Sequence, residues 1–304
     1  MPVLAPKSSG DDALLDRAYR TLQRRLSKTI DSIVEALVRR GMGQAGEAVA
    51  GPVGPLYFDF ADLTARCMAF VDLVARQEII TTARAARSFE DDPKPISEDD
   101  LPAYLKQPFV EAIREFAARD PVLARTADAV AQAYSRQRFA IARSTSVEFT
   151  TKVQQKLLVA QRAGTGMEET IKLFRKEGLG DAYAETVFRT NLATAVTAGR
   201  SAMARDPDLK GFLIGWRWLA VGDTDTRKNH MAMHGKRFRV ENPIWDVWGP
   251  PGGFNCRCER VEITRPEAEE NGWLDKNGLL KESEPPNALP DPGFRQSAVR
   301  RIYG

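Results

Sequence analysis

Histidine and cysteine are scarce in this chain, with two histidines and three cysteines among 304 residues. The odd cysteine count, in a sequence whose first ten residues lack a secretory signal, argues against a disulfide framework and predicts a reducing compartment. No run approaches the ~20 apolar residues that a membrane helix needs, so no membrane contact is expected. Basic and acidic residues nearly cancel, at 44 against 41. This balance does not favour a protein that wraps nucleic acid.

Familiar catalytic signatures are also missing. The sequence contains no phosphate-binding glycine loop, no Gly-x-Ser-x-Gly elbow and no His-Glu-x-x-His pair. With only two histidines, a serine or cysteine nucleophile would have to use one of them as its base. We therefore expect a protein that is not an enzyme.

Apolar residues at three- and four-residue steps predict helices over 14–38, 58–87, 105–119 and 122–150. Gly41 and Gly43 are expected to end the first helix, and the stretch 91–95 to form a loop. Cys67 lies within the second predicted helix, and its side chain is expected to be a small residue of the protein core. A row of basic residues is read as a solvated helix face, with a surface facing DNA or a partner as the alternative: Arg17, Arg20, Arg24 and Lys28.

The pattern changes from residue 151. Helices are predicted over 153–163, 167–176 and 181–205, and strands over 212–220, 236–240 and 258–263. The proline-rich end is expected to be an extended arm that gains its order from a partner. The predicted fold is mainly α, with a helical N-terminal half (1–150), a small α+β module (151–265) and an extended C-terminal tail (266–304).

Four sequence elements follow one another in the second half. They are Arg189-Thr190-Asn191 before a small-residue helix, the strand Trp216-Arg217-Trp218, the segment 223–230 ending in His230, and Asn255-Cys256-Arg257-Cys258 after a proline turn. In this order they resemble the Mu F-like minor head (head-morphogenesis) family of tailed bacteriophages. The stretch 290–294 is similar to the endings of some members. Asn191 departs from the family's usual glutamate, and His234 stands where an aspartate is common.

The resemblance implies a structural minor capsid protein near the portal vertex, acting in head assembly or in genome packaging and ejection. Its partners would be the portal protein, the major capsid protein or both, with packaged DNA as a further contact. It would be assembled in the host bacterial cytoplasm and located in the virion, at the capsid interior or the portal vertex. The alternative is a nuclease, or a nucleotidyl- or ADP-ribosyl-transferase-like enzyme, carried in the head, using Arg189, Asp223, Arg227 and His230. A third reading is a DNA-binding module that uses the basic row of the first helix.

Both histidines and two of the three cysteines lie close together in the sequence. A structural zinc site would use His230, His234, Cys256 and Cys258, because residues four apart share a helix face and two thiolates complete a tetrahedron. Cys-x-Cys on an extended strand would instead point its sulfurs to opposite faces, and only a tight turn would bring both to one ion. We favour a packed arrangement in which His230 bonds a backbone carbonyl and the cysteines are buried. No cofactor is then required.

Charged residues of the same segment are expected to act as a structural clamp. Asp223, Asp225 and Arg227 would pair with Arg189 or Arg200 of the preceding helix. The structural network predicted around this clamp comprises Arg189, Asn191, Asp223, Asp225, Arg227 and Asn255. Four tryptophans are expected to form the core beneath it, with a surface for stacking unpaired bases as the alternative: Trp216, Trp218, Trp245 and Trp248.

Overall fold

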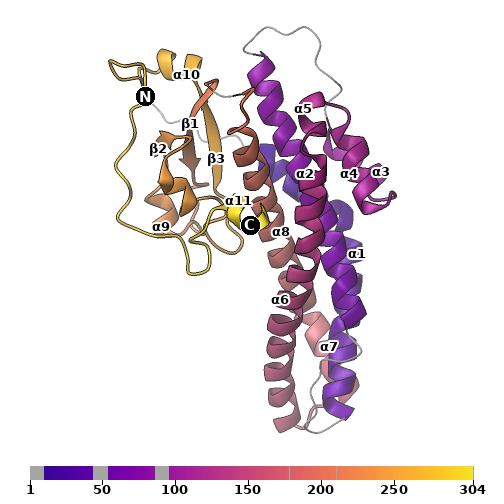
Figure 1. Cartoon of the computed structure of the whole chain (residues 1–304). Coiled ribbons are helices and arrows are strands. Elements are labelled where there is room, and N and C mark those ends of the chain that lie inside the picture. The colour runs from indigo at the N-terminus through magenta and orange to yellow at the C-terminus, as the bar shows by residue number, and fades with distance from the viewer. Residues whose placement is uncertain (1–9, 44–53, 86–95, 178, 210, 304) are drawn as a thin grey trace.

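The computed structural model describes residues 10–43, 54–85, 96–177, 179–209 and 211–303. The loop predicted at 91–95 lies outside these residues. Four long helices form the main body: α1 (Gly10–Gly43), α2 (Gly54–Ala85), α6 (Ala127–Arg162) and α8 (Leu179–Met203). The lower halves of α1 and α6 extend as a stalk that carries α7 (Met167–Lys176) near its end (Figure 1). The chain is mainly α, as predicted.

One continuous helix replaces two predicted ones. The sequence analysis separated a helix ending at residue 150 from another over 153–163, but α6 runs without a break from Ala127 to Arg162. That segmentation is wrong, and the boundary placed at 150/151 falls inside α6. The division into domains itself stays a prediction. Shorter helices complete the helical half: η1 (Glu98–Asp100), α3 (Leu101–Tyr104), α4 (Phe109–Ala117) and α5 (Pro121–Ala124).

A three-stranded antiparallel sheet follows α8. The strands are β1 (Leu213–Leu219), β2 (Arg237–Arg239) and β3 (Glu259–Thr264), in the order β2-β1-β3. All three were predicted from the sequence. They are joined by α9 (Lys228–Met231) and η2 (Pro243–Asp246), and α10 (Arg265–Glu270) follows β3. The four tryptophans predicted as core, Trp216, Trp218, Trp245 and Trp248, are each at most 2% exposed.

Helix α8 lies between the sheet and the other long helices (Figure 1). On one side, Gly199 permits close approach to α2, because a Cβ there would lie 2.6 Å from the backbone oxygen of Asp72. On the other side, Arg260 of β3 donates to the hydroxyl of Ser201 and stacks on Trp216, with its guanidinium carbon 4.1 Å from the ring centroid. The two halves of the chain therefore share one core, which runs from Leu22 to Ile302.

The C-terminal stretch does not end as a free arm. After an extended course it closes with α11 (Ala298–Tyr303), which packs against α8 and α6. The Tyr303 hydroxyl donates to the buried carboxylate of Asp72 at 2.6 Å and accepts from Arg76 at 2.7 Å. Tyr134 of α6 donates to the same carboxylate at 2.8 Å. The tail thus gains order at its end from its own chain.

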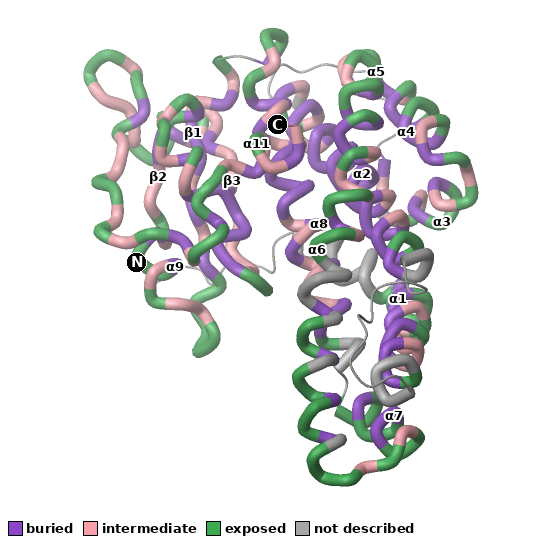
Figure 2. The backbone as a smooth tube through the Cα atoms, turned by 60° about the horizontal axis from the view of Figure 1, so that its bottom comes forward, coloured by how far each residue is buried: buried purple, intermediate pink, exposed green. Residues whose placement is uncertain are grey.

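Burial is extensive along α2 and α8, and it falls toward the end of the stalk (Figure 2). Cys67 is fully buried on α2, as predicted. The side chains of Arg20, Arg24 and Lys28 on α1 are exposed, whereas that of Arg17 lies outside the described side chains. Within the part of the chain that the structure describes, no helix combines the length and apolarity needed to cross a bilayer.

Candidate functional site

His230 lies at the centre of the polar residues that follow β1. The one-turn helix α9 carries it, and its side chain is almost wholly buried, at 2% exposure. The ring sits edge-on between Trp218 and Trp248, with centroids 6.1 Å and 6.3 Å away. The two tryptophans are themselves in edge contact at 5.5 Å. This apolar packing fixes the ring plane, so its two nitrogens have defined directions.

Two thiols face one nitrogen of that ring. The Cys256 and Cys258 sulfurs lie 3.5 Å and 3.6 Å from His230 Nδ1. They reach the same side because Cys256 and Cys258 precede β3 rather than belonging to it, and Asn255 turns the chain with a φ of 53°. Asparagine adopts this left-handed backbone conformation more readily than most other residues. The tight turn required for convergence of the sulfurs is therefore present.

The two thiols also interact with each other. Their mutual hydrogen bond lowers the pKa of Cys256, with His230 adding to the effect, and the same contact raises the pKa of Cys258. One sulfur of the pair therefore ionises well before the other. A thiolate beside an imidazole nitrogen is an arrangement that suits a soft or borderline metal ion.

His234 does not join this cluster, contrary to the set proposed from the sequence. Its Nδ1 accepts the backbone N–H of Ala220 at 3.1 Å. The prediction assumed one helix through both histidines, but α9 ends at Met231 and the chain then turns toward β2. Among the described residues, the metal-ligating group consists of His230, Cys256 and Cys258, whose ligand atoms lie within 4.8 Å of one another.

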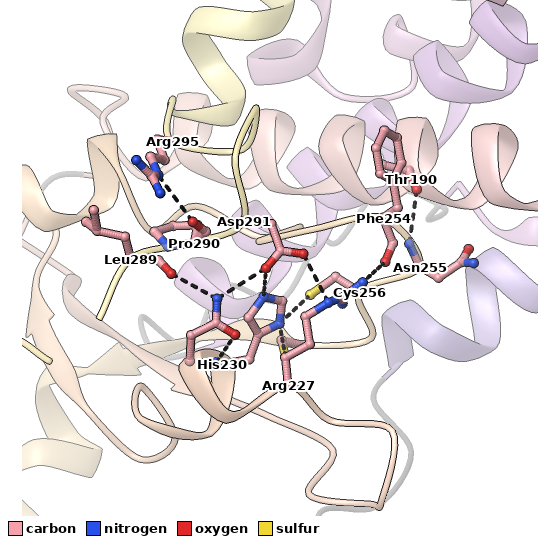
Figure 3. Close-up of polar contacts among 12 residues, drawn as sticks. Thr190, Arg227, His230, Phe254, Asn255, Cys256, Leu289, Pro290, Asp291 and Arg295 are labelled. Atoms are coloured by element: carbon pink, nitrogen blue, oxygen red, sulfur yellow. Dashed lines mark hydrogen bonds and ion pairs between the residues drawn. The ribbon is translucent and has the colours of Figure 1, made fainter. Parts of the chain in front are cut away.

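The other nitrogen of His230 faces a residue that sequence analysis did not select. Asp291 of the tail places Oδ1 3.8 Å from His230 Nε2 and Oδ2 3.0 Å from Arg227 Nε (Figure 3). Its position is fixed by its backbone N–H, which donates to Gly252 at 2.9 Å, and by the Asn229 amide at 3.2 Å. The preferred alternative, a bond from His230 to a backbone carbonyl, is not formed: Nε2 has no hydrogen-bond partner among the described residues. The sequence offered one signal for this residue: Asp291 lies between Pro290 and Pro292, in a stretch similar to the endings of some members of the Mu F-like family.

Asn255 attaches the cysteine turn to α8. Its backbone N–H donates to Thr190 Oγ1 at 3.3 Å and its side-chain amide donates to Thr186 Oγ1 at 3.0 Å. Asn191, one residue beyond Thr190, bonds within its own helix to the carbonyl of Val187 at 2.8 Å. These two bonds attach the cysteine turn to hydroxyl groups of α8.

The charged residues pair differently from the prediction. Asp223 pairs with Arg257 at 2.6 Å, and the backbone N–H of Asp225 donates to Asp223 at 3.2 Å. The Arg257 guanidinium holds the pKa of Asp223 below its ordinary value. Arg227 donates to the carbonyl of Phe254 at 2.8 Å in addition to its pair with Asp291. Arg200, expected to bind these acids, contacts Glu78 of α2 at 2.6 Å and Glu262 of β3 at 3.5 Å.

A small cavity of about 20 Å³ adjoins the two sulfurs. This volume accommodates a single water molecule and no larger substrate. Asp225, Thr226 and Arg257 complete its lining together with the His230 cluster. This cavity is therefore too small to bring a substrate to Arg227 and His230, the two members of the predicted enzyme set that line it.

Comparison with known proteins shows what one segment of the chain is similar to. Residues 151–261 match the family described as "Phage Mu protein F like protein". A Mu-like prophage FluMu F protein of Haemophilus influenzae is 40% identical over 90 residues, which are 29% of this chain and 21% of that protein. Protein F of Escherichia phage Mu, named as a candidate capsid assembly protein, is 34% identical over 88 residues, 29% of this chain and 19% of its own. No solved structure matches.

The two aligned stretches span about a fifth of each relative's length, at 21% and 19%. The match to the family model covers residues 151–261. It begins inside α6, includes α8 and β1, and ends within β3. The resemblance stated from the sequence is confirmed for residues 151–261.

Proposed function

We propose that this chain is a minor structural protein of a tailed-bacteriophage head, which acts in head assembly and transforms no substrate. The match of residues 151–261 to the Mu F-like family is the observation that supports it, since that segment contains both α8 and the His230 cluster. The relative from phage Mu is named for capsid assembly, and we extend that role to this chain.

The geometry around His230 supports a structural role over a catalytic one. A catalytic constellation presents acids, bases and donors to a space that a substrate can enter. Here Asp223, Arg227 and Asp291 are engaged within the chain, and the adjoining cavity of about 20 Å³ holds no more than a water molecule. These contacts hold the cysteine turn, α9 and the tail together.

The stalk offers the surface that we assign to docking on the portal or on the inner face of the capsid. Phe139, Leu158 and Val159 of α6 are exposed to 63%, 52% and 66%. Large apolar side chains with such exposure along one helix suit contact with another protein. In this proposal the stalk binds the head and the sheet module is the rigid end of the protein.

The test uses a phage whose gene for this chain is deleted and supplied from a plasmid. With the wild-type chain, purified particles should contain it at low copy, and without it the yield of DNA-filled heads should fall. Leu158→Glu with Val159→Glu should abolish incorporation while the purified protein stays folded, because charge on the stalk cannot be buried against a partner.

Gln155→Glu is the matched control, since it adds charge at an exposed position of the same helix. It should leave incorporation unchanged. Two results together would refute the head function. The chain would be absent from particles made with the wild-type gene supplied, and deletion of the gene would leave the yield of DNA-filled heads unchanged. Full incorporation of the Leu158 and Val159 double variant would refute the docking surface alone.

A further inference from the structure

We propose that His230, Cys256 and Cys258 bind one divalent metal ion of the zinc type, with Asp291 as the residue that orients the histidine. Each donor is a preferred zinc ligand, and the site combines one imidazole with two sulfurs. Nδ1 of His230 is the nitrogen directed at both sulfurs. His234, the fourth ligand expected from the sequence, has no part in this site.

The distances between donors fit an ion of this size. Zinc bonds nitrogen at about 2.0–2.1 Å and sulfur at about 2.3 Å. For a tetrahedral angle between these bonds, the nitrogen and sulfur atoms should lie about 3.6 Å apart. The observed separations of His230 Nδ1 from the two sulfurs are 3.5 Å and 3.6 Å. Both nitrogen–sulfur distances therefore fit one bound ion, and the three ligand atoms lie within 4.8 Å of one another.

Hydrogen bonds alone would satisfy His230 Nδ1 and the two thiols less completely than a bound metal ion would. A neutral imidazole has one acceptor lone pair at Nδ1 once Nε2 carries the proton, so only one S–H group can donate along it, and the other thiol is left with the neighbouring sulfur, which is a weak acceptor. Two thiols nevertheless converge on that nitrogen. A cation is attracted by both sulfurs and by the nitrogen at the same time, and this accounts for the convergence.

Asp291 lies where a zinc-binding histidine needs an acceptor for its second N–H group, although at 3.8 Å it is not within hydrogen-bond distance. A metal-ligating histidine donates its other N–H to a carboxylate, a carbonyl or a water, which fixes the tautomer. Nε2 of His230 is buried and has no hydrogen-bond partner among the described residues, and Asp291 Oδ1 is the carboxylate oxygen 3.8 Å from it. Gly252 and Gly253 leave the space for this approach, since a Cβ at Gly253 would lie 2.2 Å from Asp291 Oδ2.

The fourth coordination position is assigned to a water molecule. The cavity of about 20 Å³ beside the sulfurs has the volume for one, and Asp225 and Thr226 in its lining can accept or donate to it. The ion then joins three segments distant in sequence: α9, the cysteine turn and, through Asp291, the tail. Three protein ligands and a water are the coordination of catalytic zinc sites, but a cavity of about 20 Å³ admits no substrate here, so we assign the ion the role of stabilising this junction.

The test is metal content combined with cobalt spectroscopy on the full-length protein. Wild-type protein purified after growth with zinc should carry about one zinc per chain by mass spectrometry. Protein stripped by a chelator and titrated with Co²⁺ should develop the thiolate charge-transfer band and the visible bands of tetrahedral cobalt. Absence of both in folded wild-type protein supplied with the metal would overturn the proposal.

Variants identify the ligands. Cys256→Ser combined with Cys258→Ser should lose the zinc and the charge-transfer band. Asp291→Asn should keep the band and weaken the affinity by about 10- to 100-fold, as changes to residues that orient a ligand do. The matched controls His234→Gln and Cys67→Ala should each retain one zinc per chain. Zinc retained by the double cysteine variant, or lost from His234→Gln while its circular dichroism is unchanged, would refute this ligand set.

Discussion

Replacing Tyr303 by phenylalanine tests whether the C-terminal helix is an integral part of the helical core. Asp72 is fully buried and accepts from Arg76 at 2.5 Å, Tyr134 at 2.8 Å and Tyr303 at 2.6 Å. Tyr303→Phe removes one of these bonds and also the acceptor of Arg76. A hydrogen bond to a charged group contributes about 1.5–3 kcal/mol, and water can partly replace the second bond because Tyr303 is half-buried. We expect a loss of about 2–3 kcal/mol and a thermal midpoint lower by roughly 3–5 °C.

Tyr104→Phe is the matched control. Tyr104 is also buried in the helical half, but its hydroxyl has no hydrogen-bond partner among the described residues. Removing an unsatisfied buried hydroxyl should leave the stability unchanged or slightly raised. Urea unfolding followed by circular dichroism measures both variants. If Tyr303→Phe and Tyr104→Phe agree within about 0.5 kcal/mol, the buried network does not hold α11, and the reasoning is wrong.

Three further predictions follow from single positions. Gly199→Ala should lower the free energy of unfolding by about 1–3 kcal/mol, because its Cβ would meet the backbone oxygen of Asp72. The control Gly166→Ala should change the free energy of unfolding little, since no atom lies within 4 Å of a Cβ at that position. Equal urea midpoints for the two variants would contradict this prediction. Asn255→Ala should cost about 1–2 kcal/mol more than Asn255→Gly, because only alanine strains the left-handed backbone; the reverse order in thermal unfolding would disprove the assignment. Burial and the Asp72 carboxylate raise the pKa of Tyr134 and Tyr303. The tyrosines of the unfolded chain therefore ionise first, so the contribution of Tyr134 and Tyr303 to stability should be fully present below about pH 9 and be lost above about pH 10. The alkaline fall in stability should be shallower in the Tyr134→Phe, Tyr303→Phe double variant, and an equally steep fall in that variant would count against it.

Local patterns in the sequence predicted the elements whose cause is local. The alternating aromatic run around Trp216 and Trp218 predicted β1, and its burial followed from that alternation. The spacing of apolar residues predicted α1 and α2 within a few residues of their ends. Cys67 was placed in the core for the same reason, since it lies on the apolar face of its helix.

The predictions that were wrong concern features that depend on contacts between residues distant in the sequence. The change of pattern at residue 151 was interpreted as a boundary, yet α6 continues through Thr150 and Thr151 and packs on α2. The tail was predicted as an arm because its own segment holds too few apolar residues for a core. Tyr303 and Ile302 instead use a core built by helices more than a hundred residues earlier.

The site was predicted in part. The sequence brought His230 together with Cys256 and Cys258, and the structure places these three side by side. It wrongly added His234, because a four-residue spacing implies a shared face only inside a helix longer than one turn. Asp291 was missed since nothing in a sequence indicates which distant carboxylate will face a buried histidine.

Native-state hydrogen exchange at the backbone amides of Asn255 and Asp291 tests most directly whether the His230 region is a structural junction. Both amides are hydrogen-bonded, to Thr190 Oγ1 and to the Gly252 carbonyl. They should exchange as slowly as the amides of β1, and Asp291→Asn should accelerate both together. Rapid exchange of both amides in the wild-type protein, beside a protected β1, would show a mobile loop and contradict the account.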